Sequence, residues 1–68
     1  MLGVVKAVRV DRGFGFIESQ EAEGDIFFHI KDVDQSVLPW DEQLTGRRVR
    51  FNLVTNDGRN RGVAVSPV

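Results

Sequence analysis

The sequence contains no cysteine, no tyrosine, one histidine and two prolines. Without cysteine the chain can form neither a disulfide nor a thiolate metal site, and this suits a reducing interior. It shows no basic region followed by a long apolar run, and no stretch approaches the roughly 20 residues that span a bilayer. We therefore expect a soluble, cytoplasmic protein that has no membrane partner.

The residue types that carry catalysis are equally scarce. His29 is the single histidine, and no second histidine or cysteine exists to complete a metal site with it. The serines have no base partner other than that histidine, so nucleophilic catalysis has no set of side chains behind it. The segment 13–15 has two glycines but lacks the lysine and the following helix of a phosphate-binding loop. We expect no enzymatic activity, no metal and no cofactor.

The chain is short and nearly neutral. Its 68 residues carry a formal net charge of −1. A domain of this size buries only about 60% of its unfolded surface, so we expect one domain spanning 1–68 with one core. Nucleic-acid-binding proteins are usually basic, and the total charge gives that class no support. Eight of the nine basic residues fall in three groups, Lys6 with Arg9 and Arg12, then Arg47 with Arg48 and Arg50, and finally Arg59 with Arg61.

Two short runs, 12–17 and 25–30, hold four of the five phenylalanines and the only histidine. Alternate side chains of a strand point to opposite faces, so paired antiparallel strands would sort these residues into two sets. The outer set is an expected patch of four rings, Phe14, Phe16, Phe27 and His29. The inner set is an expected core wall, Ile17, Ile26 and Phe28.

An exposed group of rings usually marks a binding surface. Bases stack on such rings with about 1–3 kcal/mol per base, whatever the base. Gly13 and Gly15 are expected to leave room for a nucleotide beside the rings. Glu18 shares this face and would repel phosphates, unless it pairs with Arg12 or Lys6. The alternative, that every ring belongs to the core, requires burial of both faces in a chain too short to cover both.

The rest of the pattern predicts strands at 3–10, 48–53 and 63–66, besides 14–18 and 25–30. The segment 56–58, Asn-Asp-Gly, predicts a tight hairpin turn. Turn and cap formers fill 31–45, where at most one helical turn fits, near 30–34. Trp40 in this connection is expected to be an exposed sixth ring, with a cap over the barrel core as the alternative. Five short strands and no long helix predict an all-β fold, a small closed barrel.

Lys6 and the two runs resemble the bacterial cold-shock domain, and the resemblance covers nearly the whole chain. It implies a five-stranded antiparallel oligonucleotide/oligosaccharide-binding (OB) barrel that binds single-stranded RNA and DNA. It also implies that Lys6 and Arg12 meet phosphates or base edges. By the same resemblance the four rings named above stack bases, Trp40 covers a further base, and either Arg59 or Arg61 contacts the ligand.

The chain departs from that family at three positions. The family typically has a tryptophan and a phenylalanine after the lysine of its first strand, where this chain has Ala7 and Val8. Ile30 stands where the second motif usually ends in an aromatic residue. Two missing surface rings would weaken binding by about tenfold to several thousandfold.

These observations predict a monomeric protein that binds single-stranded RNA or DNA. It would act as an ATP-independent RNA chaperone or as a regulator of transcription or translation. The acidic net charge and the three departures leave an alternative open, a divergent OB barrel that serves as a protein–protein interaction module with weak or no nucleic-acid binding.

Overall fold

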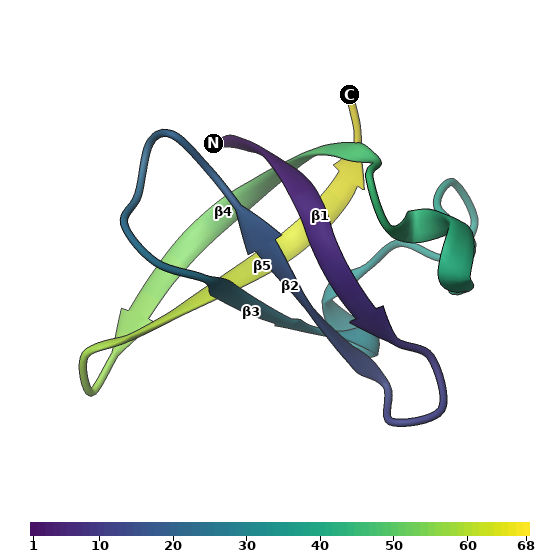
Figure 1. Cartoon of the computed structure of the whole chain (residues 1–68), viewed down its shortest axis with the longest axis horizontal. Coiled ribbons are helices and arrows are strands. Elements are labelled where there is room, and N and C mark those ends of the chain that lie inside the picture. The colour runs from purple at the N-terminus through teal and green to yellow at the C-terminus, as the bar shows by residue number, and fades with distance from the viewer.

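The computed structural model describes all residues from 1 to 68 and shows five strands that close into a barrel, in the order β1-β2-β3-β5-β4 (Figure 1). The strands are β1 (Leu2–Arg9), β2 (Phe14–Glu18), β3 (Ile26–His29), β4 (Arg48–Asn56) and β5 (Arg59–Pro67). Two single-turn 3-10 helices, η1 (Ile30–Asp32) and η2 (Glu42–Leu44), lie between β3 and β4. The predicted all-β, five-stranded OB barrel is confirmed. Neither 3-10 helix has the length or the apolar character that a membrane-spanning helix requires.

The hairpin between β4 and β5 is longer than the alternation predicted. Asp57 and Gly58 have positive φ angles of 52° and 74°. Positive φ at both positions is required in the two-residue turn whose twist matches that of the strands. Because this turn is tight, pairing continues to its base at Asn56 and Arg59. Both strands therefore have nine residues.

Two further features differ from the expectation. The seam between β3 and β5 is parallel, with Phe27 opposite Arg61. These strands are not consecutive, since the long connection and β4 lie between them, so no hairpin forces them to be antiparallel. The second 3-10 turn, η2, was not expected. Its cap is Asp41, whose carboxylate accepts a hydrogen bond from the Gln43 N–H at 2.8 Å.

The core is one cluster of 11 buried residues, and Ile17, Ile26 and Phe28 lie in it with 0% exposure, as predicted. Gly15 also faces this core. A Cβ built there would lie 2.9 Å from the Phe28 ring and 2.7 Å from the Ala7 carbonyl oxygen. The expectation that Gly15 leaves room for a nucleotide is therefore wrong, since its missing side chain makes room for Phe28.

Gly13 has a different role from the one expected as well. Its φ of +76° lies in the left-handed region that favours glycine, in the turn between β1 and β2. The Ile30 side chain lies 3.4 Å from the place of a Cβ there, so this position packs against η1 rather than against open ligand space.

Strand β1 contains a bulge at Lys6. Val5 pairs with Ile17 and Ala7 pairs with Phe16, so Lys6 has no partner of its own on β2. The extra residue explains why Val5 and Val8 are both buried although they are three positions apart. It also brings Ala7 to the outer face, opposite Phe16.

Candidate nucleic-acid interface

The outer face of β2 and β3 carries Phe14, Phe16, Phe27 and His29, hereafter the ring patch. The register places Phe14 opposite His29 and Phe16 opposite Phe27. The three phenyl centroids lie 5.7 to 6.1 Å apart, with one stacked pair and two edge-to-face pairs. All four side chains are half-buried, because each covers part of its neighbours while one side faces solvent. Contacts between the rings therefore orient them before any ligand arrives.

His29 is fixed at the edge of the ring patch because it caps η1. The imidazole Nδ1 of His29 accepts a hydrogen bond from the Lys31 backbone N–H at 3.1 Å. The backbone N–H of His29 donates to Asp32 Oδ2 at 2.8 Å. An Nδ1 that accepts leaves the proton of the neutral ring on Nε2. No protein group bonds Nε2, so it can donate to a ligand.

Basic side chains lie around the ring patch. Lys6 pairs with Asp25 at 3.1 Å, and both groups are about half exposed. Arg12 is exposed in the turn before β2. Arg9 lies opposite Phe14 in the register and is exposed on the same face. Arg9 belongs to the same basic group of the sequence as Lys6 and Arg12 but is not among the predicted site residues, although its outward position follows from the buried Val8 before it.

Glu18 does not make the ion pair considered for it. The structure contains two ion pairs, Lys6 with Asp25 and Arg61 with Asp32. The partner of Lys6 is therefore Asp25, and Glu18 stays an exposed, unpaired carboxylate at the end of β2.

Arg61 is one of the two candidate arginines on β5, and which of the two contacts a ligand stays a prediction. It lies opposite Phe27, and its guanidinium donates twice to Asp32, from Nε and from Nη2, at 3.0 Å each. Partial burial by itself would raise the pKa of Asp32, but the hydrogen bonds from Arg61 and the His29 N–H, with the Arg61 charge, lower it overall. The same contact with Asp32 raises the pKa of Arg61.

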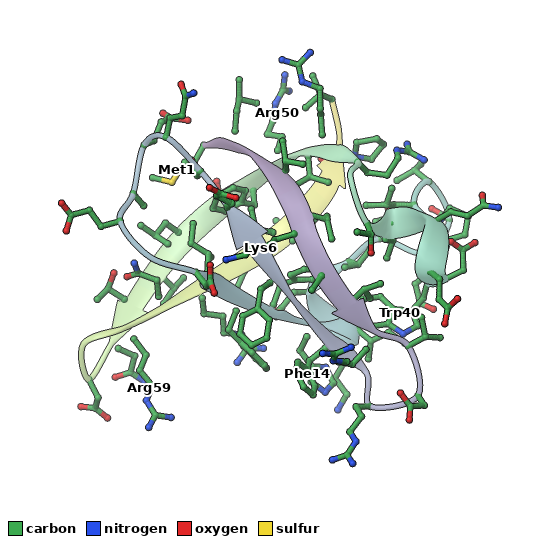
Figure 2. All side chains as sticks on the ribbon, in the orientation of Figure 1. Met1, Lys6, Phe14, Trp40, Arg50 and Arg59 are labelled. Carbon is green, nitrogen blue, oxygen red and sulfur yellow. The ribbon has the colours of Figure 1, made fainter.

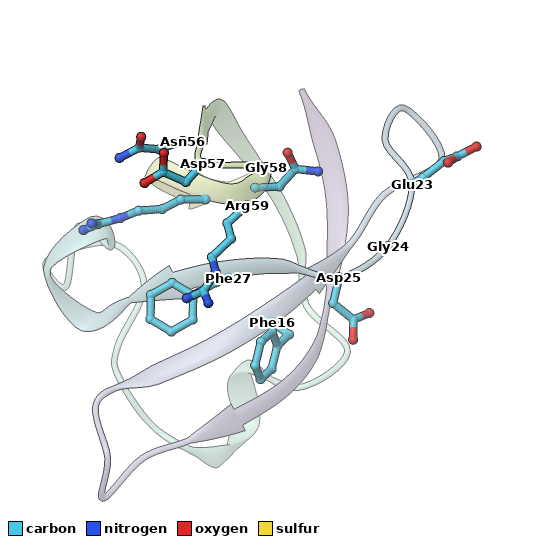
Figure 3. Close-up of a pocket in the computed structure, with 11 residues that line it drawn as sticks. Phe16, Glu23, Gly24, Asp25, Phe27, Asn56, Asp57, Gly58 and Arg59 are labelled. Atoms are coloured by element: carbon cyan, nitrogen blue, oxygen red, sulfur yellow. The ribbon is translucent and has the colours of Figure 1, made fainter.

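An open cleft of about 940 Å³ lies beside the ring patch (Figure 3). Phe16 and Phe27 form one side of it. The loop before β3 and the tip of the β4–β5 hairpin form the rest, with Glu23, Gly24, Asp25, Asn56, Asp57, Gly58, Arg59, Asn60 and Arg61. The sequence predicts only a turn at Asn56, Asp57 and Gly58, and no local signal indicates that this turn lines the same cleft as the rings.

Trp40 is not the exposed sixth ring that was expected. It is half-buried against the core, edge to face with Phe28 at 5.8 Å, and its Nε1 donates to the Val10 carbonyl at 3.1 Å. In Figure 2 it lies near the end of β1, far from Arg59 at the hairpin tip. The structure thus favours the alternative, a cap over the barrel core, and contact of Trp40 with a ligand stays a prediction.

The three departures from the aromatic pattern do not lie in equivalent places. Ala7 is on the outer face next to Phe16, where a ring would extend the patch. Val8 belongs to the core with 8% exposure, so a ring there would not add to the outer surface. Ile30 is half-buried at the start of η1.

The structure contains no group of three or more His, Cys, Asp or Glu side chains that could hold a metal ion.

The chain is similar to proteins of known family and known structure. Residues 1–68 match the family model described as 'Cold-shock' DNA-binding domain. The "Probable cold shock protein y4cH" of Sinorhizobium fredii (strain NBRC 101917 / NGR234) is 35% identical over 52 residues, which make up 76% of this chain and 72% of that relative. The solved structure "drosophila Unr CSD456" has a TM-score of 0.79 and 21% identity over 98% of this chain. This chain spans 26% of that structure, and the likeness shows the fold.

Proposed function

The chain belongs to the cold-shock domain family, whose members generally bind single-stranded nucleic acid, and we propose that it binds single-stranded RNA or DNA by stacking bases on the ring patch. The observation that carries the proposal is the contact of three solvent-facing phenyl rings on one outer face. Stacking contributes about 1–3 kcal/mol per base and tolerates any sequence. Residues 1–68 act as one monomeric binding unit in this proposal.

The rim of the patch supplies polar contacts to a bound strand. His29 Nε2 donates to a base edge, and Arg9 and Arg12 meet phosphates. Lys6 exchanges Asp25 for a phosphate, at little cost because an exposed ion pair of this kind contributes only about 0.2–1 kcal/mol. With so few cations at the rim, the slope of log K against log salt should be no steeper than about −4.

Binding of unpaired strands is sufficient for the proposed biological role. The flat faces of bases are accessible to the rings only when the strand is unstacked and unpaired, so binding shifts RNA away from duplex without ATP. This supports a role as an RNA chaperone, or as a regulator of transcription or translation, with no catalytic step. A reducing interior suits a chain without disulfides, and the cytoplasm is the proposed location.

The test is to replace Phe14, Phe16 and Phe27 singly by alanine and to titrate each variant into a labelled uridine hexamer, following fluorescence anisotropy. Each loss of a ring should weaken binding by about 5- to 150-fold. Val37→Ala is the matched control, because Val37 is an exposed apolar side chain in the connection between β3 and β4. Unchanged affinity in all three variants, with circular dichroism showing that they are folded, would overturn the proposal.

A specific observation favours a second candidate, a protein-interaction module. Leu2 and Val4 on β1 are 51% and 41% exposed, and Val68, beside the same surface hollow, is 68% exposed. Exposed apolar side chains that lie together are a common feature of protein contact surfaces. If this candidate is right, oligonucleotides will not bind even at millimolar concentration.

A further inference from the structure

A carboxylate holds one arginine of the cleft in a fixed orientation. Arg61 donates from Nε to Asp32 Oδ2 and from Nη2 to Asp32 Oδ1, at 3.0 Å each. This side-on pairing uses two of the five N–H donors of a guanidinium. The remaining donors include one on each Nη that point in parallel from the end of the planar group, and no protein group bonds Nη1. The end of the guanidinium is therefore a free two-pronged donor.

Asp32 is itself firmly placed. The Asp32 side chain is 8% exposed, against 49% for Arg61. Its Oδ2 also accepts a hydrogen bond from the His29 backbone N–H at 2.8 Å. One carboxylate thus ties Arg61 to the junction of β3 and η1. A free arginine loses side-chain conformational entropy when a ligand orders it, and an arginine oriented in advance loses less.

The charge of the pair decides which ligand group suits it. The formal charges of Asp32 and Arg61 cancel, so a phosphate is attracted less strongly than it would be by an unpaired arginine. Two adjacent neutral acceptors match the free donors better, and among the bases guanine presents such a pair in O6 and N7. Arg61 lies opposite Phe27 in the pairing of β3 and β5, and both line the same cleft, so a base stacked on Phe27 would occupy the cleft that Arg61 borders.

We propose that Asp32 is a positioning residue that presents the end of Arg61 to O6 and N7 of a guanine stacked on Phe27, so that the protein selects guanine at one position of a single strand. This inference rests on the proposed function, since it requires a base on the ring patch.

The test uses uridine hexamers in which a single guanosine occupies each position in turn, competed against a labelled uridine hexamer. At one position guanosine should tighten binding by about tenfold. The same hexamer with 7-deazaguanosine, which keeps O6 but has no N7 acceptor, should lose most of this gain. Arg61→Lys keeps the charge without the two-pronged donor, so it should abolish the guanosine preference.

Two measurements on Asp32→Asn, the salt slope and the guanosine preference, distinguish a positioning role of Asp32 from a purely structural one. Asp32→Asn removes the neutralising charge, so Arg61 becomes available to a phosphate. The slope of log K against log salt should steepen by about 0.7, and the guanosine preference should fall. If Asp32 were only a structural brace, Asp32→Asn would lower the melting temperature but would change neither the salt slope nor the guanosine preference. If Asp32→Asn does not fold, Asp32→Ser is the second variant, because its hydroxyl oxygen can still accept the His29 backbone N–H while the charge is removed, and it should show the same steeper slope and weaker guanosine preference.

The outcomes separate the inference from the proposed function. Equal binding of guanosine, 7-deazaguanosine and uridine hexamers overturns guanine selection and leaves single-strand binding intact. A steeper dependence on salt in Asp32→Asn without any guanosine preference in the parent chain identifies Arg61 as a phosphate ligand, which also overturns the inference. Failure of every single strand to bind overturns both.

Discussion

Strands β2 and β3 carry phenylalanine on both of their faces, and the two faces differ in what surrounds each ring. Phe28 points inward, has 0% exposure and packs in the core with Ile17 and Ile26. Phe27, its neighbour in the chain, points outward, and the aromatic rings it contacts are those of Phe14 and Phe16, one stacked and one edge to face. The same residue type therefore stabilises the core on one face and, in the proposed function, stacks bases on the other. Substitutions should separate these two effects.

The largest effect is expected at Phe28. Phe28→Ala removes a fully buried ring and should lower the free energy of unfolding by about 3–5 kcal/mol. A small domain has about 5–15 kcal/mol in total, so the variant should be partly or wholly unfolded. Urea unfolding followed by circular dichroism measures this, with Phe27→Ala as the matched control. If the two variants lose equal stability, the distinction between the faces is wrong.

Gly15→Ala tests the packing of the inner face by adding volume to it instead of removing volume. The added methyl group would meet the Ala7 carbonyl oxygen at 2.7 Å and the Phe28 ring at 2.9 Å, so something must shift. We expect a loss of about 1–3 kcal/mol in unfolding free energy, the usual cost of overpacking. A variant of parental stability that binds single strands poorly would contradict this assignment, because it would show that Gly15 makes room for the ligand.

Ala7→Trp should extend the ring patch. Ala7 lies opposite Phe16 on the outer surface, so a ring there should offer one further stacking surface. Binding of a uridine hexamer should tighten by about 5- to 150-fold. Val4→Trp is the control, since Val4 is exposed on the same strand but pairs with Glu18, beyond the rings. Equal gains in both variants would show that a ring anywhere on β1 suffices, against a localised patch.

The smallest effect is the pH dependence from Asp32. Its folded pKa is lowered from 3.8, so the ionised form stabilises the fold fully above about pH 4, and this contribution is lost as pH falls through the folded pKa. The stability difference between the parent chain and Asp32→Asn should therefore shrink below about pH 4. We expect this stability difference to shrink by at most about 1 kcal/mol, because Arg61 is half exposed.

Urea unfolding of both chains between about pH 2 and pH 7 measures that difference. Asp34 also has a lowered pKa, which arises from its hydrogen bonds with Ser36, but it is present in both chains and cancels. A difference that stays constant over the whole range would contradict the assigned role of the Asp32 carboxylate.

The division of β2 and β3 into two faces could be predicted from the sequence because it depends on a local rule. Neighbouring side chains of a strand alternate, so Phe27 and Phe28 had to point in opposite directions once a strand was assigned. The turn at 56–58 was equally local, since Asp57 and Gly58 tolerate positive φ.

The features that could not be predicted depend on contacts between distant residues. The bulge at Lys6 is set by how β1 fits β2 and the closed barrel, and no local residue specifies it. Arg61 and Asp32 are 29 positions apart, so their pairing depends on the parallel seam between β3 and β5. The place of Trp40 depends in the same way on the open end of the core, where Phe28 offers an edge-to-face contact.

The most direct test is an NMR titration of the ¹⁵N-labelled chain with a uridine hexamer. Single-strand binding on the outer face of β2 and β3 predicts amide shift changes at the ring patch and at Arg61, while Leu2 and Val4 at the N-terminal end of β1 stay unshifted. Shifts confined to Leu2 and Val4, or no shifts at millimolar hexamer, would show that the rings do not receive bases.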